Sequence, residues 1–137
     1  MFKWKENLSC NIEEIDGQHQ NLLKLGQELY DLLKLGNDVD KYDDIMKVLS
    51  KLADYTVYHF GYEEELLAKH GYPLLESHKK QHQSFVTKIE ETLKQDIDSK
   101  QSSITMEMIM FIADWIEKHI LGSDHQYASF LNQKGIH

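Results

Sequence analysis

Four long stretches of this chain carry apolar residues at spacings of three and four, and very little interrupts them. Pro73 is the single proline among the 137 residues, and the glycines occur singly. A recurrence at three and four is the period of an α-helix with one buried face, and the scarcity of helix breakers allows such helices to be long. The pattern therefore predicts an all-α protein.

The four stretches place the expected helices at about residues 16–35, 41–69, 73–96 and 102–122. Pro73 suits the first turn of the third helix, and Gly122-Ser123 is expected to end the fourth. Helices of this length with short polar loops pack as an up-down-up-down antiparallel four-helix bundle. We expect an N-terminal extended arm before the bundle and a short C-terminal helical segment after it. No repeat or linker divides the sequence, so residues 1–137 are expected to form a single domain.

Charge and apolar content limit the partners and the location. The chain has 23 acidic against 15 basic residues, a formal charge of −8, whereas nucleic acids and anionic membranes bind basic patches. The apolar-leaning residues 104–112 are far shorter than the roughly 20 needed to cross a bilayer, and residues 1–7 lack a secretory signal. We expect a cytoplasmic monomer with no nucleic-acid partner and no membrane insertion. Cys10 is the only cysteine, which excludes an internal disulfide and a thiolate-only metal centre.

Histidines and carboxylates interrupt the apolar faces at helical contact spacing. His59 and Glu63 are four residues apart in the second expected helix, and His78 and His82 are four apart in the third. Residues at this spacing lie one turn apart on the same face of a helix, so each pair can reach one metal site.

The remaining candidates lie near the ends of the first and fourth helices. His119 and Asp124 are five residues apart, which on an unbroken α-helix separates them by about 140°. We therefore expect the helix to end at Gly122-Ser123, so that Asp124 can turn back toward the bundle axis. His19 lies near the start of the first helix.

These seven residues are predicted to share one layer of the bundle. The starts of the first and third helices and the ends of the second and fourth meet at one end of an antiparallel bundle, and the candidates lie at those places. A single pair of this kind is more often structural. Burying five imidazoles and two carboxylates without partners would cost a few kcal/mol each, so a metal centre is favoured. Seven ligands exceed the needs of one zinc ion and indicate two metal ions with bridging carboxylates.

The sequence resembles the hemerythrin family, and most closely its free-standing bacterial members, across nearly the whole chain. The matching positions are Trp4, Ile15-Asp16-Gly17-Gln18-His19, His59-Phe60, Glu63-Glu64, His78, His82, Phe85, Trp115, His119-Ile120, Asp124 and Tyr127.

The resemblance implies two iron ions, diferrous or diferric, joined by an oxo or hydroxo bridge. It assigns one iron to three histidines and the other to two, with both carboxylates bridging; the implied ligands are His78, His82 and His119 at the first iron, His19 and His59 at the second, and Glu63 and Asp124 between them. The second iron keeps one open position, at which O2 binds. The implied function is reversible O2 binding for storage, delivery or scavenging, not enzymatic catalysis, with an O2-consuming enzyme as a candidate partner.

The surroundings of the two irons can also be assigned by resemblance. The expected wall of the O2 pocket consists of Leu22, Phe60, Trp115 and Ile116, which also serve as ordinary core. Gln18, Tyr62, Glu64 and Tyr127 are candidate supports for the ligands. The other histidines match no ligand position: His70 is expected at a helix C-terminus, His137 has no assigned role, and His125 is expected to face outward, with a place near the site mouth as the alternative.

Three other functions stay open at this point. The same centre could sense O2, redox state or nitric oxide, although sensor modules are usually fused to a signalling output for which this chain leaves no room. A di-iron peroxidase, oxidase or nitric-oxide-reducing enzyme would need a general acid near the open iron, for which the sequence offers no strong candidate. Metal storage or a dizinc site gains little from a cage saturated with histidine.

Overall fold

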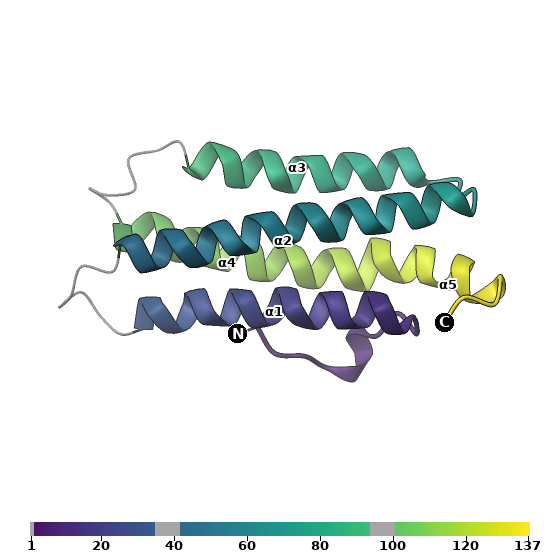
Figure 1. The fold of residues 1–137 in the computed structure, drawn as a ribbon, viewed down its shortest axis with the longest axis horizontal. Coiled ribbons are helices and arrows are strands. Elements are labelled where there is room, and N and C mark those ends of the chain that lie inside the picture. The colour runs from purple at the N-terminus through teal and green to yellow at the C-terminus, as the bar shows by residue number, and fades with distance from the viewer. Residues whose placement is uncertain (1, 35–41, 94–100) are drawn as a thin grey trace.

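Four long helices lie side by side in alternating directions and form the body of the molecule (Figure 1). The computed structural model describes residues 2–34, 42–93 and 101–137. Its long helices are α1 (Glu13–Lys34), α2 (Tyr42–Lys69), α3 (Leu75–Leu93) and α4 (Gln101–His119). Helices α1 and α3 each contact both α2 and α4. This arrangement, which has no strand in the described ranges, confirms the predicted antiparallel four-helix bundle.

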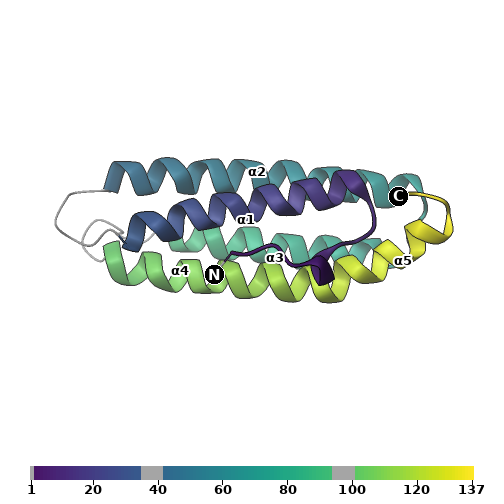
Figure 2. The ribbon, with the colours of Figure 1, turned by 90° about the horizontal axis from the view of Figure 1, so that it is seen from below.

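An N-terminal arm precedes the bundle and runs along its outside (Figure 2). The arm contains one 3₁₀ turn, Glu6–Leu8, and buries the side chains of Phe2 and Leu8. The Phe2 ring occupies the space beside Gly26, where an added Cβ would lie 2.5 Å from its carbon atoms. Gly26 is therefore needed for this close approach of the arm to α1.

The start of α1, at Glu13, is three residues earlier than expected, and the other main difference from the predicted helix limits lies around Pro73. α2 ends where Gly71 adopts a φ of +68°, and the Tyr72 N–H then donates to the Leu67 carbonyl at 3.0 Å. This bond closes the helix in the manner typical of a glycine in the left-handed region. α3 begins at Leu75, two residues later than expected, after a turn that contains Pro73. The predicted limits at residues 35, 41 and 96 fall outside the described residues.

The predicted break at Gly122-Ser123 is wrong. The backbone continues from α4 through a π-helical turn, Ile120–Asp124, directly into α5 (His125–Gln133). Gly122 is not among the glycines with positive φ, so it does not end a helix. In the π-helical turn the His125 N–H donates to the Ile120 carbonyl, five residues earlier, as well as to Gly122.

A layer of buried polar residues divides the core into two apolar clusters. The first cluster fills the middle and far end of the bundle and includes Leu22, Phe60 and Ile116. The second lies at the end of the bundle where α5 packs and includes Ile15, Leu67 and Tyr127. On α1, α2 and the α4–α5 segment, the polar residues come between members of the two clusters along the chain. Among the described residues, no helix is both long and apolar enough to span a bilayer.

Candidate metal centre

The polar layer contains all seven residues that the sequence singled out. α1 supplies one, α2 and α3 two each, α4 one and the π-helical turn one; they are His19, His59, Glu63, His78, His82, His119 and Asp124. None is more than 7% exposed. The structure therefore brings the predicted residues together, and it does so in one layer.

The π-helical turn gives Asp124 its position in this layer. In a π-helix the hydrogen bond joins residues five apart, so these residues lie nearly one above the other. His119 and Asp124 have this separation, and the Nε2 atom of His119 lies 3.1 Å from Oδ1 of Asp124. One extra residue in the turn thus achieves what the predicted helix break was expected to achieve.

The two carboxylates separate the histidines into two unequal groups. Glu63 Oε1 lies 3.7 and 3.2 Å from the Nε2 atoms of His78 and His82. Its other oxygen, Oε2, lies 3.5 Å from the Nε2 atoms of both His19 and His59.

Asp124 divides its oxygens in the same way. Oδ1 lies 3.2 Å from His78 Nε2 and 3.1 Å from His119 Nε2, whereas Oδ2 lies 3.1 Å from His19 Nε2. Each carboxylate therefore has one oxygen near a three-histidine group (His78, His82 and His119) and the other oxygen near a two-histidine group (His19 and His59). Both groups, each with the two carboxylates, have ligand atoms within 4.8 Å of one another.

Hydrogen bonds on the outer nitrogen fix the orientation of three imidazoles. Nδ1 of His82 lies 2.8 Å from the Glu64 carboxylate, and Nδ1 of His59 lies 2.7 Å from Oε1 of Gln18. The Gln18 amide is oriented by its own bond from Nε2 to Glu14, at 3.0 Å. Since these oxygens only accept, Nδ1 carries the proton in both histidines, and the lone pair of Nε2 points into the layer.

Sequence reasoning missed the corresponding partner of His119. Gln81 Oε1 accepts from His119 Nδ1 at 3.0 Å and from the Ser123 hydroxyl at 2.5 Å. The pairing crosses from α3 to α4, and no spacing within one helix could have indicated it. Tyr127 also acts as expected, because its hydroxyl donates to Glu63 Oε2. Tyr62 instead packs half-buried against the second apolar cluster, so its expected support of a ligand is not observed.

The buried histidines and carboxylates of the layer strongly influence one another's pKa values. Burial lowers the pKa of His59 to about 4, so this imidazole stays neutral. Burial also disfavours protonated His78, but the nearby carboxylates of Asp124 and Glu63 outweigh it and raise the pKa of His78 to about 9. Burial alone would raise the pKa of Glu63 and Asp124, yet the surrounding histidines hold both pKa values well below their usual range. The layer thus contains two ionised carboxylates that require positive charge.

The nitrogen and oxygen atoms of the layer are better placed to bind metal ions than to form hydrogen bonds with one another. Five inward-facing atoms lack a hydrogen bond of acceptable geometry: His19 Nε2, His78 Nε2, Glu63 Oε1, and both Asp124 oxygens. Leaving such buried groups unsatisfied costs roughly 1–3 kcal/mol each. The distances between these imidazole nitrogens and carboxylate oxygens are 3.1–3.7 Å. Two ligand atoms that bind one metal ion at right angles, with bonds of about 2.1 Å, lie about 3 Å apart, which is close to these distances. Mixed imidazole and carboxylate donors suit a first-row metal ion.

A small pocket adjoins the two-histidine group. His19 and His59 line it together with His119 and Asp124, and the volume open to the centre of a water-sized molecule is only about 10 Å³. All four residues expected to form the pocket wall line it, namely Leu22, Phe60, Trp115 and Ile116. Thr56, Phe85 and Ile120 complete the apolar side and were not foreseen. We call this space the site pocket.

The other histidines and Cys10 lie outside the polar layer. His70 follows the last residue of α2, as expected, and exposed His137 lies near Asn11. His125 is half-buried at the start of α5, and its Nε2 has no hydrogen-bond partner. Cys10 packs in the second apolar cluster close to Asp16 and His19, and burial raises the pKa of its thiol. Asp16 is already engaged, since it accepts from Ser9 Oγ at 2.5 Å and from the Cys10 N–H at 2.7 Å.

Comparison with known proteins agrees with this geometry. Residues 10–131 match the family model described as the hemerythrin HHE cation binding domain. The chain is 40% identical over 127 residues to a bacteriohemerythrin of Clostridium acetobutylicum, covering 93% of this chain and 98% of that one. It is 29% identical to a bacteriohemerythrin of Stenotrophomonas maltophilia, with 93% and 80% covered, and 29% identical to a myohemerythrin of Theromyzon tessulatum, with 92% and 90% covered. Its fold, its buried histidine and carboxylate cluster and these relationships show that the chain belongs to the hemerythrin family.

Proposed function

We propose that this protein binds O2 reversibly at a di-iron centre held by the seven residues of the polar layer. The observation that carries the proposal is the unequal division of histidines by two shared carboxylates. Glu63 and Asp124 each place one oxygen toward the three-histidine group and the other toward the two-histidine group. Two ions held in this way receive the same two bridging carboxylates but unequal numbers of imidazoles.

Iron is the metal that agrees best with both the donor atoms of the layer and the family to which the chain belongs. Imidazole and carboxylate donors together suit borderline first-row ions, and the three-histidine group with the two carboxylates has five donor residues, more than the four that a structural zinc takes. A di-iron pair with one incomplete coordination sphere supplies reversible O2 binding at that ion. In this chain His19 and His59 would hold the ion with the incomplete sphere, and both residues line the site pocket.

The chain's own residues restrict what can enter. Leu22, Phe60, Trp115 and Ile116 keep this side of the centre apolar, and the small size of the pocket admits a diatomic molecule rather than an organic substrate. Thr56 contributes a hydroxyl, but it is bonded to the Leu52 carbonyl at 2.7 Å. The one hydroxyl among the described lining residues is therefore already engaged, which favours binding and release of O2 over its reduction.

The imidazole supports serve the same function. Gln18, Glu64 and Gln81 hold the outer nitrogens of His59, His82 and His119, so the inner nitrogens face the metals without rearrangement. Such outer contacts typically change metal affinity by about 10–100-fold when removed. We propose that residues 1–137 act as one domain that stores, delivers or scavenges O2, with an O2-consuming enzyme as a partner for delivery.

The test is the visible absorption of the iron-loaded protein. O2 is added to the anaerobic, reduced form, and the gas is then removed. A colourless sample that turns red-violet and bleaches again supports reversible binding, and the metal-free protein treated in the same way provides the baseline. Irreversible conversion to the oxidised form, or two zinc ions per chain in the purified protein, would refute the proposal.

A further inference from the structure

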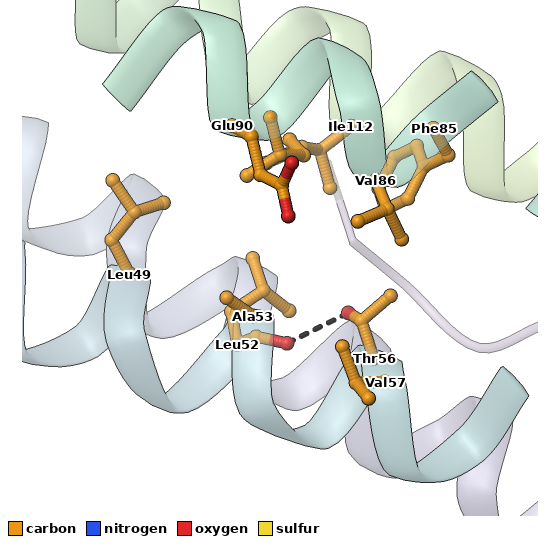
Figure 3. Close-up of a pocket in the computed structure, with 10 residues that line it drawn as sticks. Leu49, Leu52, Ala53, Thr56, Val57, Phe85, Val86, Glu90 and Ile112 are labelled. Atoms are coloured by element: carbon orange, nitrogen blue, oxygen red, sulfur yellow. Dashed lines mark hydrogen bonds between the residues drawn. The ribbon is translucent and has the colours of Figure 1, made fainter. Parts of the chain in front are cut away.

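A second apolar cavity lies between α2, α3 and α4, next to the site pocket (Figure 3). The volume open to the centres of water-sized molecules is about 80 Å³, several times the corresponding volume of the site pocket. Figure 3 shows Leu49, Leu52 and Ala53 of α2 facing Val86 of α3 and Ile112 of α4 across it. We call it the α2–α3 cavity.

The α2–α3 cavity and the site pocket share a boundary. Thr56 and Phe85 line both spaces. The Thr56 hydroxyl is turned toward its own helix, where it donates to the Leu52 carbonyl, as the dashed line in Figure 3 marks. With this oxygen satisfied, Thr56 places no free polar group between the two spaces. A small apolar molecule meets no polar barrier there.

The other end of the α2–α3 cavity reaches the protein surface. Val57 lines it and is 60% exposed, and Glu90 lines it and is also exposed. Val86 and Ala53, which are half-buried, lie between these rim residues and the interior. Glu90 is the single charged residue of the lining. Side chains of α2 and α3 therefore line an unbroken path from solvent to Thr56 and Phe85.

We propose that the α2–α3 cavity is the docking site and entry route through which O2 reaches the two-histidine side of the centre. An apolar lining disfavours water, and apolar cavities bind small apolar guests such as xenon. O2 is small and apolar, so the cavity concentrates it while disfavouring water and ions. The inference rests on the proposed function, which makes O2 the ligand.

Two other spaces approach the centre and are less suited to O2. A groove that reaches Phe60 and His82 is lined by Glu64, Lys79 and Lys80, so water fills it readily. A smaller space under the N-terminal arm reaches Ile116 between charged Lys3 and Glu117. Its alanine, Ala113, provides a matched position for comparison with Ala53 of the α2–α3 cavity.

Xenon tests the docking site without any O2 chemistry. Crystals of the iron-loaded protein are pressurised with xenon, and the anomalous signal is located. A xenon site bounded by Leu52, Thr56 and Phe85 is expected. The absence of xenon from the α2–α3 cavity would count against its role in docking.

The kinetics of O2 binding test the route. Ala53→Phe fills the α2–α3 cavity, and it should slow both O2 association and O2 dissociation by about tenfold, the factor of a barrier about 1.4 kcal/mol higher, while the equilibrium affinity stays unchanged. Asp54→Phe places the same ring on the exposed neighbouring position and should leave both rates unchanged. Val57→Trp, at the exposed rim, provides a second blocking variant that does not disturb the core.

The outcomes separate the route from the function. If Ala113→Phe slows O2 binding while Ala53→Phe and Val57→Trp do not, the route is refuted and entry lies under the arm. If xenon occupies the α2–α3 cavity but the protein does not bind O2 reversibly, the proposed function fails and the docking site for apolar gas stands.

Discussion

Asp124 Oδ1 lies 3.1 Å from His119 Nε2, although the two residues are five positions apart in a continuous helical segment. The π-helical turn Ile120–Asp124 makes this possible, because its hydrogen bonds bring residues five apart onto one side. The same turn leads directly into α5, from which Tyr127 reaches the polar layer and donates to Glu63. One local change in helical hydrogen bonding therefore positions the Asp124 carboxylate and also the Tyr127 hydroxyl, which supports the Glu63 carboxylate.

Gly122→Ala tests whether this segment is helical. Gly122 has no positive φ, and a Cβ added there would meet nothing within 4 Å. The substitution should raise the free energy of unfolding by about 0.4–1 kcal/mol and leave metal binding intact, measured by urea unfolding and metal analysis. Gly71→Ala, at a φ of +68°, should instead lower stability by about 1–2 kcal/mol. A loss of metal in Gly122→Ala would indicate that the glycine is needed to redirect Asp124.

Glu63→Ala tests the shared carboxylate. Glu63 faces histidines of both groups through its two oxygens, so its removal should lower the measured iron content below two ions per chain. Asp124→Ala should do the same, for the same reason. Glu65→Ala removes an exposed carboxylate two residues along α2 and should retain both ions. Two ions per chain in Glu63→Ala would contradict the bridging assignment.

Tyr127→Phe tests the hydrogen bond to Glu63. Both side chains are buried, and the substitution leaves one oxygen of an ionised carboxylate with one donor fewer. The iron-free protein should lose about 1.5–3 kcal/mol of unfolding free energy in urea, as expected for hydrogen bonds to charged groups. Tyr58→Phe changes an exposed tyrosine and should stay within about 0.5 kcal/mol of the parent. Equal losses in the two variants would show that the hydroxyl of Tyr127 contributes nothing specific.

The stability of the iron-free protein should fall as pH rises above neutrality. The pKa of His78 is raised from 6.5 to about 9 in the folded state, because Asp124 and Glu63 outweigh the effect of burial. A folded state that holds a proton more tightly than the unfolded state is stabilised fully below pH 6.5, and this contribution disappears as pH rises through about 9. Urea unfolding at several pH values measures it.

His78→Gln serves as the control for this pH dependence. The variant lacks the titrating imidazole and should show a shallower loss of stability between the same two pH values. An unchanged slope would assign the proton uptake to another group of the cluster.

Local spacing was sufficient to predict much of the site. His59 with Glu63 and His78 with His82 each lie one turn apart on one helix, so their placement follows from helical geometry wherever the helix forms. The common height of all seven residues followed from the antiparallel order of helices with short connections. The apolar wall was assigned by resemblance, and two of its members, Leu22 and Ile116, each lie three residues from a histidine on the same helix.

Contacts between helices were harder to predict. Gln81 and His119 are 38 residues apart, and their bond depends on how α3 and α4 are rotated about their axes. Tyr62 was expected beside the ligands, yet it packs against the second apolar cluster, because one position along a helix changes direction by about 100°. The π-helical turn was missed because its hydrogen bonding is rare and has no distinct sequence signal.

The helices, their order and the candidate ligands could be read from the amino-acid sequence, because each depends on periodicity and spacing along one chain. The division of the oxygens of Glu63 and Asp124 between three histidines and two became visible in the packed bundle. Only the tertiary structure decided that an apolar cavity meets the site pocket at Thr56 and Phe85. Both features depend on the rotation and separation of packed helices, which the filling of the core sets and which no single helix encodes.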